Sequence, residues 1–300
     1  LENMDDPFAD QKSTKENQVI SNIKEYALPI DKSVKSTAET SFDFDSRTGT
    51  YEWDNDASQW SYEDNSQDEI IIVFPADSTN MGENNATLTI DNYEDQEIDD
   101  GDSVYYQPTA IEADLVIDGE EHVNLNMTAE WDDTNGDPLA LNASVFLNPF
   151  TFTGDIETTS KSGSIDFAID YDDTQIFSTG IDVDFKDDTK EEPTLIDGYI
   201  QYREMNIEAN INVENIEQII ADFEAGDSDF DSMDAINDEI DAKLFHDGKK
   251  VADIEIGGID EETDEPTIIL VFNDGTEENA EQYFDDFATR IEEFFQNMSS

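Results

Sequence analysis

Carboxylates recur at alternate positions in one stretch of the sequence, which is the spacing of a calcium loop. Asp227, Asp229 and Asp231 offer the oxygen ligands that calcium prefers. An EF-hand loop would also need glycine at its sixth position and glutamate at its twelfth, where this chain has Ser232 and Asp238. We therefore predict no cofactor, with calcium as the one candidate and Asp227, Asp229 and Asp231 as its candidate ligands. Chance spacing in an acidic chain is the competing interpretation.

The sequence lacks the residue combinations that common catalytic mechanisms need. The chain has no cysteine and only two histidines, His122 and His246, neither with a serine or aspartate partner at a recognisable spacing. Carboxylate pairs hydrolyse glycosides, but 77 acidic residues make any such pair uninformative. Trp53 and Trp60 flank a predicted turn, where they either stack on a sugar or pack on each other across two strands. We predict no catalytic residue and a non-enzymatic protein.

The net charge limits what the surface can bind. The 77 acidic and 14 basic residues give a formal net charge of -63. Such a surface repels phosphate backbones, which excludes nucleic acid as a partner. Like charges also oppose folding, and molar salt removes most of that penalty by shortening the Debye length to about 3 Å. The composition indicates halophilic adaptation, with cation binding as the alternative. No apolar run is long enough for a membrane span, so we do not expect an integral membrane protein.

A period of two residues dominates the elements that would position these groups. Apolar side chains alternate with Asn, Asp and Glu most clearly in 111–131, 139–147, 165–171 and 205–213. Strict alternation over so many runs predicts antiparallel strands with one buried face and one acidic, solvated face. Dipeptides such as Asp118-Gly119 separate the runs and predict tight hairpins.

Helical spacing occurs in three places. Residues 1–40 form a polar leader or tether in which Val19, Ile20, Ile23, Tyr26 and Ala27 predict one short helix. Residues 41–300 are expected to form a single β-rich domain with helices near 214–242 and 277–297. Glu277, Glu278 and Glu281 are predicted in the first turn of the last helix.

These elements predict an α+β fold. About ten strands expose one apolar face, and three or four helices each carry one apolar stripe. The simplest closure is a large curved antiparallel sheet with one face covered by three or four helices. A β-sandwich is the alternative.

Three stretches resemble those of an uncharacterised family of envelope lipoproteins from Bacteroidetes-type bacteria. They are Gly49–Trp53, Leu141–Phe150 and Asp197–Tyr202, and the resemblance covers residues 45–225. It implies an exported protein of the cell envelope that is lipid-anchored in its full-length precursor, although the lipid-bearing cysteine of such proteins is absent here. The predicted plan of sheet and helices is also similar to the lipoprotein-carrier fold, whose concave face holds acyl chains. That second likeness is an analogy of plan alone.

Three function hypotheses follow. The first is a non-enzymatic exported envelope or surface protein that binds an apolar ligand, such as a lipid or acyl chain, between sheet and helices. Its basis is the supply of Phe, Ile and Met on the inner faces, although these residues also serve to fill a core. The second is an acidic surface adhesion or interaction module that binds calcium, and the third is a carboxylate glycosidase.

Overall fold

The computed structural model describes residues 41–65, 68–76, 83–225, 233–259 and 266–298. In these ranges the chain forms sixteen strands, and helix accounts for only about 12% of the protein. The chain divides into two compact units, unit 1 (Leu1–Asp155) and unit 2 (Ile156–Ser300). The predicted leader helix within 1–40 lies outside the described residues.

The predicted α+β fold, a large curved antiparallel sheet with one face covered by three or four helices, is wrong. Helix at about 12% of the residues provides no such layer in the described ranges, and the β-sandwich alternative fits the β content better. The sheet is also mixed rather than antiparallel, because β1 (Gly49–Asp54) pairs parallel with β3 (Ile70–Phe74). The apolar stripes in the sequence predict that helices form, but they predict neither the number of helices nor the surface that each helix packs against.

The strands of unit 1 are hydrogen-bonded in the order β8-β7-β6-β5-β4-β3-β1-β2, where β8 ends three residues beyond the boundary at Asp155. Besides β1 and β3, their bounds are β2 Gln59–Glu63, β4 Ala86–Asp99, β5 Val104–Ile117, β6 Glu120–Trp131, β7 Pro138–Leu147 and β8 Phe150–Thr158, and a short 3-10 turn spans Asp45–Arg47. Asp118 and Gly119 join β5 to β6 with φ of 54° and 85°, the left-handed conformation that a two-residue hairpin turn requires.

The core of unit 1 lies on one face of this sheet. Ile70, Ile72 and Phe74 of β3 are almost completely buried there, at 1%, 1% and 0% exposure. Phe42 and Phe44, which precede β1, pack against the same cluster. The apolar residues of each strand share this face because side chains alternate along a strand.

In unit 2 the order is β16-β15-β14-β13-β12-β11-β10-β9. The bounds are β9 Ser162–Tyr171, β10 Thr174–Phe185, β11 Pro193–Tyr202, β12 Met205–Asn212, β13 Ile240–His246, β14 Lys249–Ile259, β15 Pro266–Phe272 and β16 Glu277–Asn279, with helices α2 Val213–Glu224, α3 Asp234–Asn237 and α4 Glu281–Met298. Glu277 and Glu278 therefore belong to β16, and of the three glutamates predicted in the first helical turn only Glu281 lies there.

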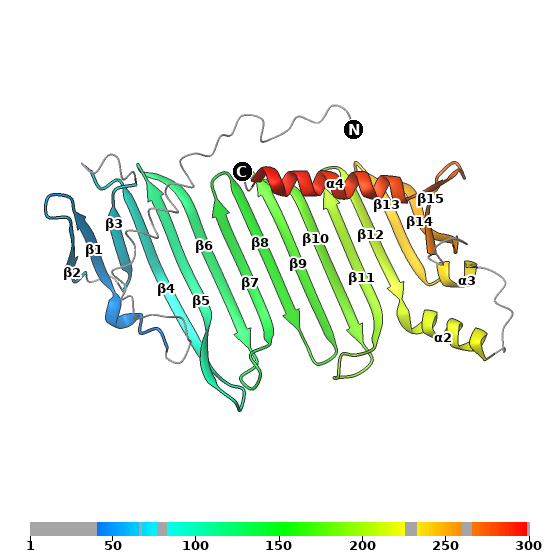
Figure 1. The fold of residues 1–300 in the computed structure, drawn as a ribbon, viewed down its shortest axis with the longest axis horizontal. Helices are drawn as coiled ribbons and strands as arrows, with labels where there is room; N and C mark the ends of the chain where they lie inside the picture. The colour runs from blue at the N-terminus through cyan, green and yellow to red at the C-terminus, as the bar shows by residue number, and fades with distance from the viewer. Residues whose placement is uncertain (1–40, 66–67, 77–82, 226–232, 260–265, 299–300) are drawn as a thin grey trace. The chain divides into compact units, whose positions relative to one another are not determined.

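Two helices lie at opposite ends of the strands of unit 2. Figure 1 shows α4 across one end of β9–β12 and α2 at the other end of β11 and β12. The Asn212 side chain caps α2 by accepting a hydrogen bond from the Asn215 N–H at 3.1 Å. Phe284 of α4 packs against a core cluster that includes Leu244, Ala252 and Leu270. Helix α4 thus covers one end of this sheet face, whereas Ile220 and Phe223 of α2 remain 44% and 49% exposed.

Candidate functional site

One face of unit 2 is apolar along β9 and β10, and its burial changes along the strands. Ile169 of β9 pairs with Phe177 of β10, and these side chains are 0% and 5% exposed. Four residues further along, Ile165 pairs directly with Ile181, and these side chains are 53% and 44% exposed. Both pairs project from the same face because each spacing along the strand is even.

Helix α4 accounts for the covered end. The ring of Tyr202, which pairs with Phe177, contacts the rings of Phe287 and Phe294 at 6.4 and 6.0 Å between centroids. Both contacts are edge-on, the arrangement that aromatic pairs favour. Exposure of the face therefore rises with distance from α4. We call its uncovered part the open apolar face, and its residues are Ile165, Ile181, Val183 and Ile196.

The open apolar face can do one kind of chemistry, which is to remove a nonpolar group from water. Complete burial of an isoleucine side chain stabilises a protein by about 1.5–3 kcal/mol relative to leaving it exposed. Because Ile165 and Ile181 are about half exposed, a large part of this stabilisation is absent in the isolated chain. Exposed apolar side chains that lie side by side mark interaction sites more often than isolated ones do.

Two lysines lie beside the open apolar face, where β9 begins and β10 ends. Lys161 Nζ donates a hydrogen bond to the Lys186 carbonyl at 3.1 Å, and the Phe185 N–H donates to the Lys161 carbonyl at 2.8 Å. Lys186 Nζ lies 2.5 Å from Glu192 Oε2, and this hydrogen bond is the main reason that the pKa of Lys186 is raised. Residues 41–300 contain only nine basic residues, 14 less the five of residues 1–40. Two of them lie at this corner of the sheet, where Lys186 is paired with Glu192.

The opposite face of unit 2 is polar and carries carboxylates. Asp182 of β10 lies directly opposite Asp197 of β11, and Asn210 Nδ2 donates to Asp197 Oδ1 at 2.6 Å. These residues line a shallow groove of about 420 Å³. The Tyr199 hydroxyl donates to Asp166 Oδ1 at 2.9 Å, and the pKa of Tyr199 is raised by partial burial first and by this bond second. The arrangement concentrates negative charge on this face.

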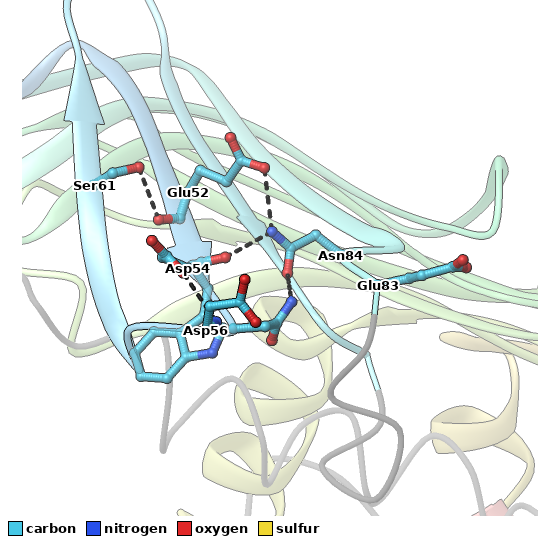
Figure 2. Close-up of a pocket in the computed structure, with 8 residues that line it drawn as sticks. Glu52, Asp54, Asp56, Ser61, Glu83 and Asn84 are labelled. Carbon is cyan, nitrogen blue, oxygen red and sulfur yellow. Dashed lines mark hydrogen bonds between the residues drawn. The ribbon is translucent and has the colours of Figure 1, made fainter.

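Unit 1 has an acidic hollow beside the β1–β2 hairpin (Figure 2). It measures about 710 Å³, and its lining residues are Glu52, Trp53, Asp54, Asn55, Asp56, Ser61, Glu83 and Asn84. Asn84 lies at its centre, where its Nδ2 donates to Glu52 Oε1 at 3.3 Å and to the Trp53 carbonyl at 2.8 Å, while Asn55 Nδ2 donates to Asn84 Oδ1 at 3.2 Å. Within the described ranges, no three His, Cys, Asp or Glu side chains are grouped so as to hold a metal ion. The hollow concentrates negative charge beside the β1–β2 hairpin.

Not all of the residues singled out from the sequence are described by the structure. The predicted calcium ligands Asp227, Asp229 and Asp231 lie outside the described residues, so calcium binding there stays a prediction. His122 is half-buried on β6 in unit 1, whereas His246 is exposed at the end of β13 in unit 2.

The two tryptophans of the first hairpin pack on each other. Trp53 and Trp60 are directly paired across β1 and β2, with ring centroids 5.4 Å apart at 71°. Cross-strand packing, rather than a sugar platform, accounts for their positions.

The open apolar face and its lysine pair were not predicted as a site. Alternation placed Ile165 and Ile181 on the buried side of the sheet, and nothing in the local pattern distinguishes a covered face from an uncovered one. The lysines offered the one usable signal, because Lys161 and Lys186 flank two consecutive predicted strands in a chain with few basic residues.

No family model, no curated protein and no solved structure matches the chain. Of the helices in the described part of the chain, none is both long and apolar enough to cross a membrane.

Proposed function

We propose that this protein is a non-enzymatic binding protein that holds an acyl chain against the open apolar face of unit 2. The observation that carries the proposal is the half-exposed pair Ile165 and Ile181, which lie directly opposite each other on a face that α4 covers only at its far end. A flexible hydrocarbon chain fits this surface because it can lie along the strands from the open end towards the aromatic side chains beneath α4.

Lys161 supports an acyl chain with an anionic headgroup. It lies four residues from Ile165, an even step that keeps the two on the same face, whereas Lys186 lies five residues from Ile181, an odd step, and is paired with Glu192. At about 3.3 Å per residue, Lys161 is roughly 13 Å away from Ile165, which suits a carboxylate or phosphate at one end of the chain. Elsewhere the protein, with a net charge of -63, repels anions, so Lys161 would give the ligand one orientation.

Export to the cell envelope belongs to the same proposal. Its support is the resemblance of Gly49–Trp53, Leu141–Phe150 and Asp197–Tyr202 to envelope lipoproteins. A protein that handles acyl chains next to a membrane surface is consistent with that location.

The test is a titration of the full chain with a fluorescent fatty acid, together with native mass spectrometry of the gently purified protein. We expect saturable binding with one ligand per chain. The double variant Ile165→Thr and Ile181→Thr keeps β-branched side chains but reduces the apolar surface, so it should weaken binding about tenfold or more. The matched control is Asp182→Asn with Asp184→Asn, on the opposite face of β10, which should leave the affinity within about twofold.

A second pair of variants tests the headgroup. Lys161→Gln with Lys186→Gln should weaken binding of the fatty acid but not of its uncharged methyl ester. If the wild-type chain takes up no probe, or if the isoleucine variant binds as well as the wild type, the proposed function is wrong. Equal losses for the acid and the ester would refute the role of the lysines alone.

A further inference from the structure

Helix α4 closes the apolar face of unit 2 at one end (Figure 1). Ile169, Phe177 and Tyr202 form a row of directly paired residues across β9, β10 and β11. Ile169 and Phe177 are 0% and 5% exposed, and Phe294 of α4, whose ring contacts that of Tyr202, is 4% exposed. Packed side chains therefore occupy the space over this row. We call Ile169, Phe177, Tyr202 and Phe294 the closed end.

Between the closed end and Lys161 the same face is only partly covered. Phe167 and Thr179 are paired in the next row and are half-buried, and the exposed pair Ile165 and Ile181 follows. All of these side chains lie on one face, because they are an even number of residues apart along each strand. Lys161, which is exposed, directly precedes β9. The partly covered stretch thus begins at a positive charge and stops at packed rings.

The length of this stretch limits the length of a ligand that lies on it. Ile169 is eight residues beyond Lys161, which at about 3.3 Å per residue is roughly 26 Å. A carbon–carbon bond of about 1.5 Å advances an extended hydrocarbon chain by about 1.25 Å per carbon. An acyl chain whose carboxylate lies at Lys161 therefore reaches the closed end after about 20 carbons.

We infer that the closed end limits the length of the bound acyl chain, so that the preferred ligand is a saturated fatty acid of about 16–20 carbons. This inference rests on the proposed function and adds to it the class of ligand and the residues that select it. Each methylene short of the limit loses contact with water on the side that faces the sheet, so it should tighten binding about twofold. A methylene beyond the limit finds no apolar surface and adds nothing.

The experiment measures the affinity of the full chain for saturated fatty acids from decanoic to tetracosanoic acid, by displacement of a bound fluorescent fatty acid. The affinity of the wild type should rise about twofold per carbon up to about 20 carbons and then stop rising. Each variant is compared with the wild type at every chain length. The ratio of their affinities for one acid does not depend on the solubility of that acid, so the longest chains can be included.

Thr179→Phe should shorten the limit. It places a ring two residues nearer to Lys161 than Phe177 is, a shift of about 6.6 Å or about five carbons. Decanoic acid should bind as it does to the wild type, whereas eicosanoic acid should bind at least about tenfold more weakly. Thr179→Val is the matched control, because it removes the same hydrogen bond from Thr179 Oγ1 to the Tyr199 carbonyl without adding a ring.

Tyr202→Leu should lengthen the limit by removing a ring from the closed end. Docosanoic acid should then bind about fourfold more tightly than it does to the wild type, while decanoic acid is unchanged. Tyr199→Leu, on the opposite face of β11, is the control and should leave every ratio near one. Phe294→Leu opens the same end from α4 and replaces Tyr202→Leu if circular dichroism shows that this variant does not fold.

Two results would overturn the inference and leave acyl binding itself intact. One is a wild-type affinity that does not depend on chain length. The other is an equal loss of affinity for decanoic and eicosanoic acid in Thr179→Phe, which would mean that this residue does not act through chain length. Failure of every acid to bind the wild type would instead refute the proposed function, and this inference with it.

Discussion

Neutralising Asp182 should stabilise the protein, and the gain should disappear in salt. Asp182 and Asp197 face each other directly across β10 and β11 on the polar face of unit 2. Asn210 donates one hydrogen bond to Asp197, but an amide does not neutralise a carboxylate. Like charges in this position destabilise a sheet, so Asp182→Asn should remove a repulsion without removing a packed side chain.

The size of the effect follows from the register. Directly paired side chains lie about 5 Å apart, where two unit charges in water repel each other by about 0.8 kcal/mol. Salt at 0.1 M, with a Debye length of about 10 Å, reduces this repulsion to about 0.5 kcal/mol, and 1 M salt, with about 3 Å, reduces it to about 0.15 kcal/mol. The expected rise in melting temperature is therefore about 1–2 °C at low salt.

Calorimetric melting at both salt concentrations measures the prediction, with Asp184→Asn as the matched control. Asp184 is exposed on the same face of the same strand, but its paired neighbours are Leu195 and Ser162. The difference between the two variants isolates the directly opposed charges. Equal shifts for both variants at low salt, or a gain for Asp182→Asn that persists in 1 M salt, would show that direct pairing of carboxylates is not what salt relieves.

Two further predictions concern single side chains. The pKa of Asp114 is raised, first by burial and next by the negative charges of Asp91 and Glu121. The folded state therefore binds this proton more tightly than the unfolded state does. The protein accordingly loses stability as the pH rises from the ordinary aspartate pKa to the raised pKa. Asp114→Asn should accordingly stabilise the protein at pH 7 by less than about 1 kcal/mol, which a thermal melt shows as a higher melting temperature. If this stabilisation were undiminished below about pH 4, repulsion and burial of the Asp114 charge would not be its cause. A side chain at Gly180 would clash with the Tyr199 ring and the Asp166 carboxylate, so Gly180→Ala should cost about 1–3 kcal/mol. In a thermal melt the control Gly198→Ala, whose added methyl group would meet only an ordinary contact at 3.5 Å, should cost measurably less.

The faces of the strands could be predicted from the sequence, but their cover could not. Alternation assigned Asp182 and Ile181 to opposite faces correctly, because the side-chain period of a strand is two. The same pattern cannot show whether another element lies over the apolar side. Ile165 therefore reads as a core residue in the sequence and is 53% exposed in the structure.

The helices illustrate the same limit from the other direction. An amphipathic stripe such as that of α4 shows that one side of the helix is buried, but not how many strands the helix covers. The predicted layer of three or four helices was wrong for this reason. At the start of the last helix, Glu277 and Glu278 favoured a helical turn by charge, yet they pair with Val271 and Leu270 in the edge strand β16, an interaction that no local pattern encodes. The predicted calcium ligands belong to neither group, since they lie outside the described residues.

The order of the strands has a consequence for how the chain acquires its structure. From β9 to β16 in unit 2, and from β3 to β8 in unit 1, each strand lies beside the strand that precedes it in the sequence. Most long-range contacts therefore close only short loops, whose entropic cost is small. Sheets with such local connectivity fold faster than those that pair distant segments. In unit 1 the parallel pair of β1 and β3 is the exception, because these strands are not consecutive in the sequence. The strand between them, β2, pairs with the other edge of β1. We expect the hairpins of each unit to form first, and the β1–β3 pair to be the slow step in the folding of unit 1.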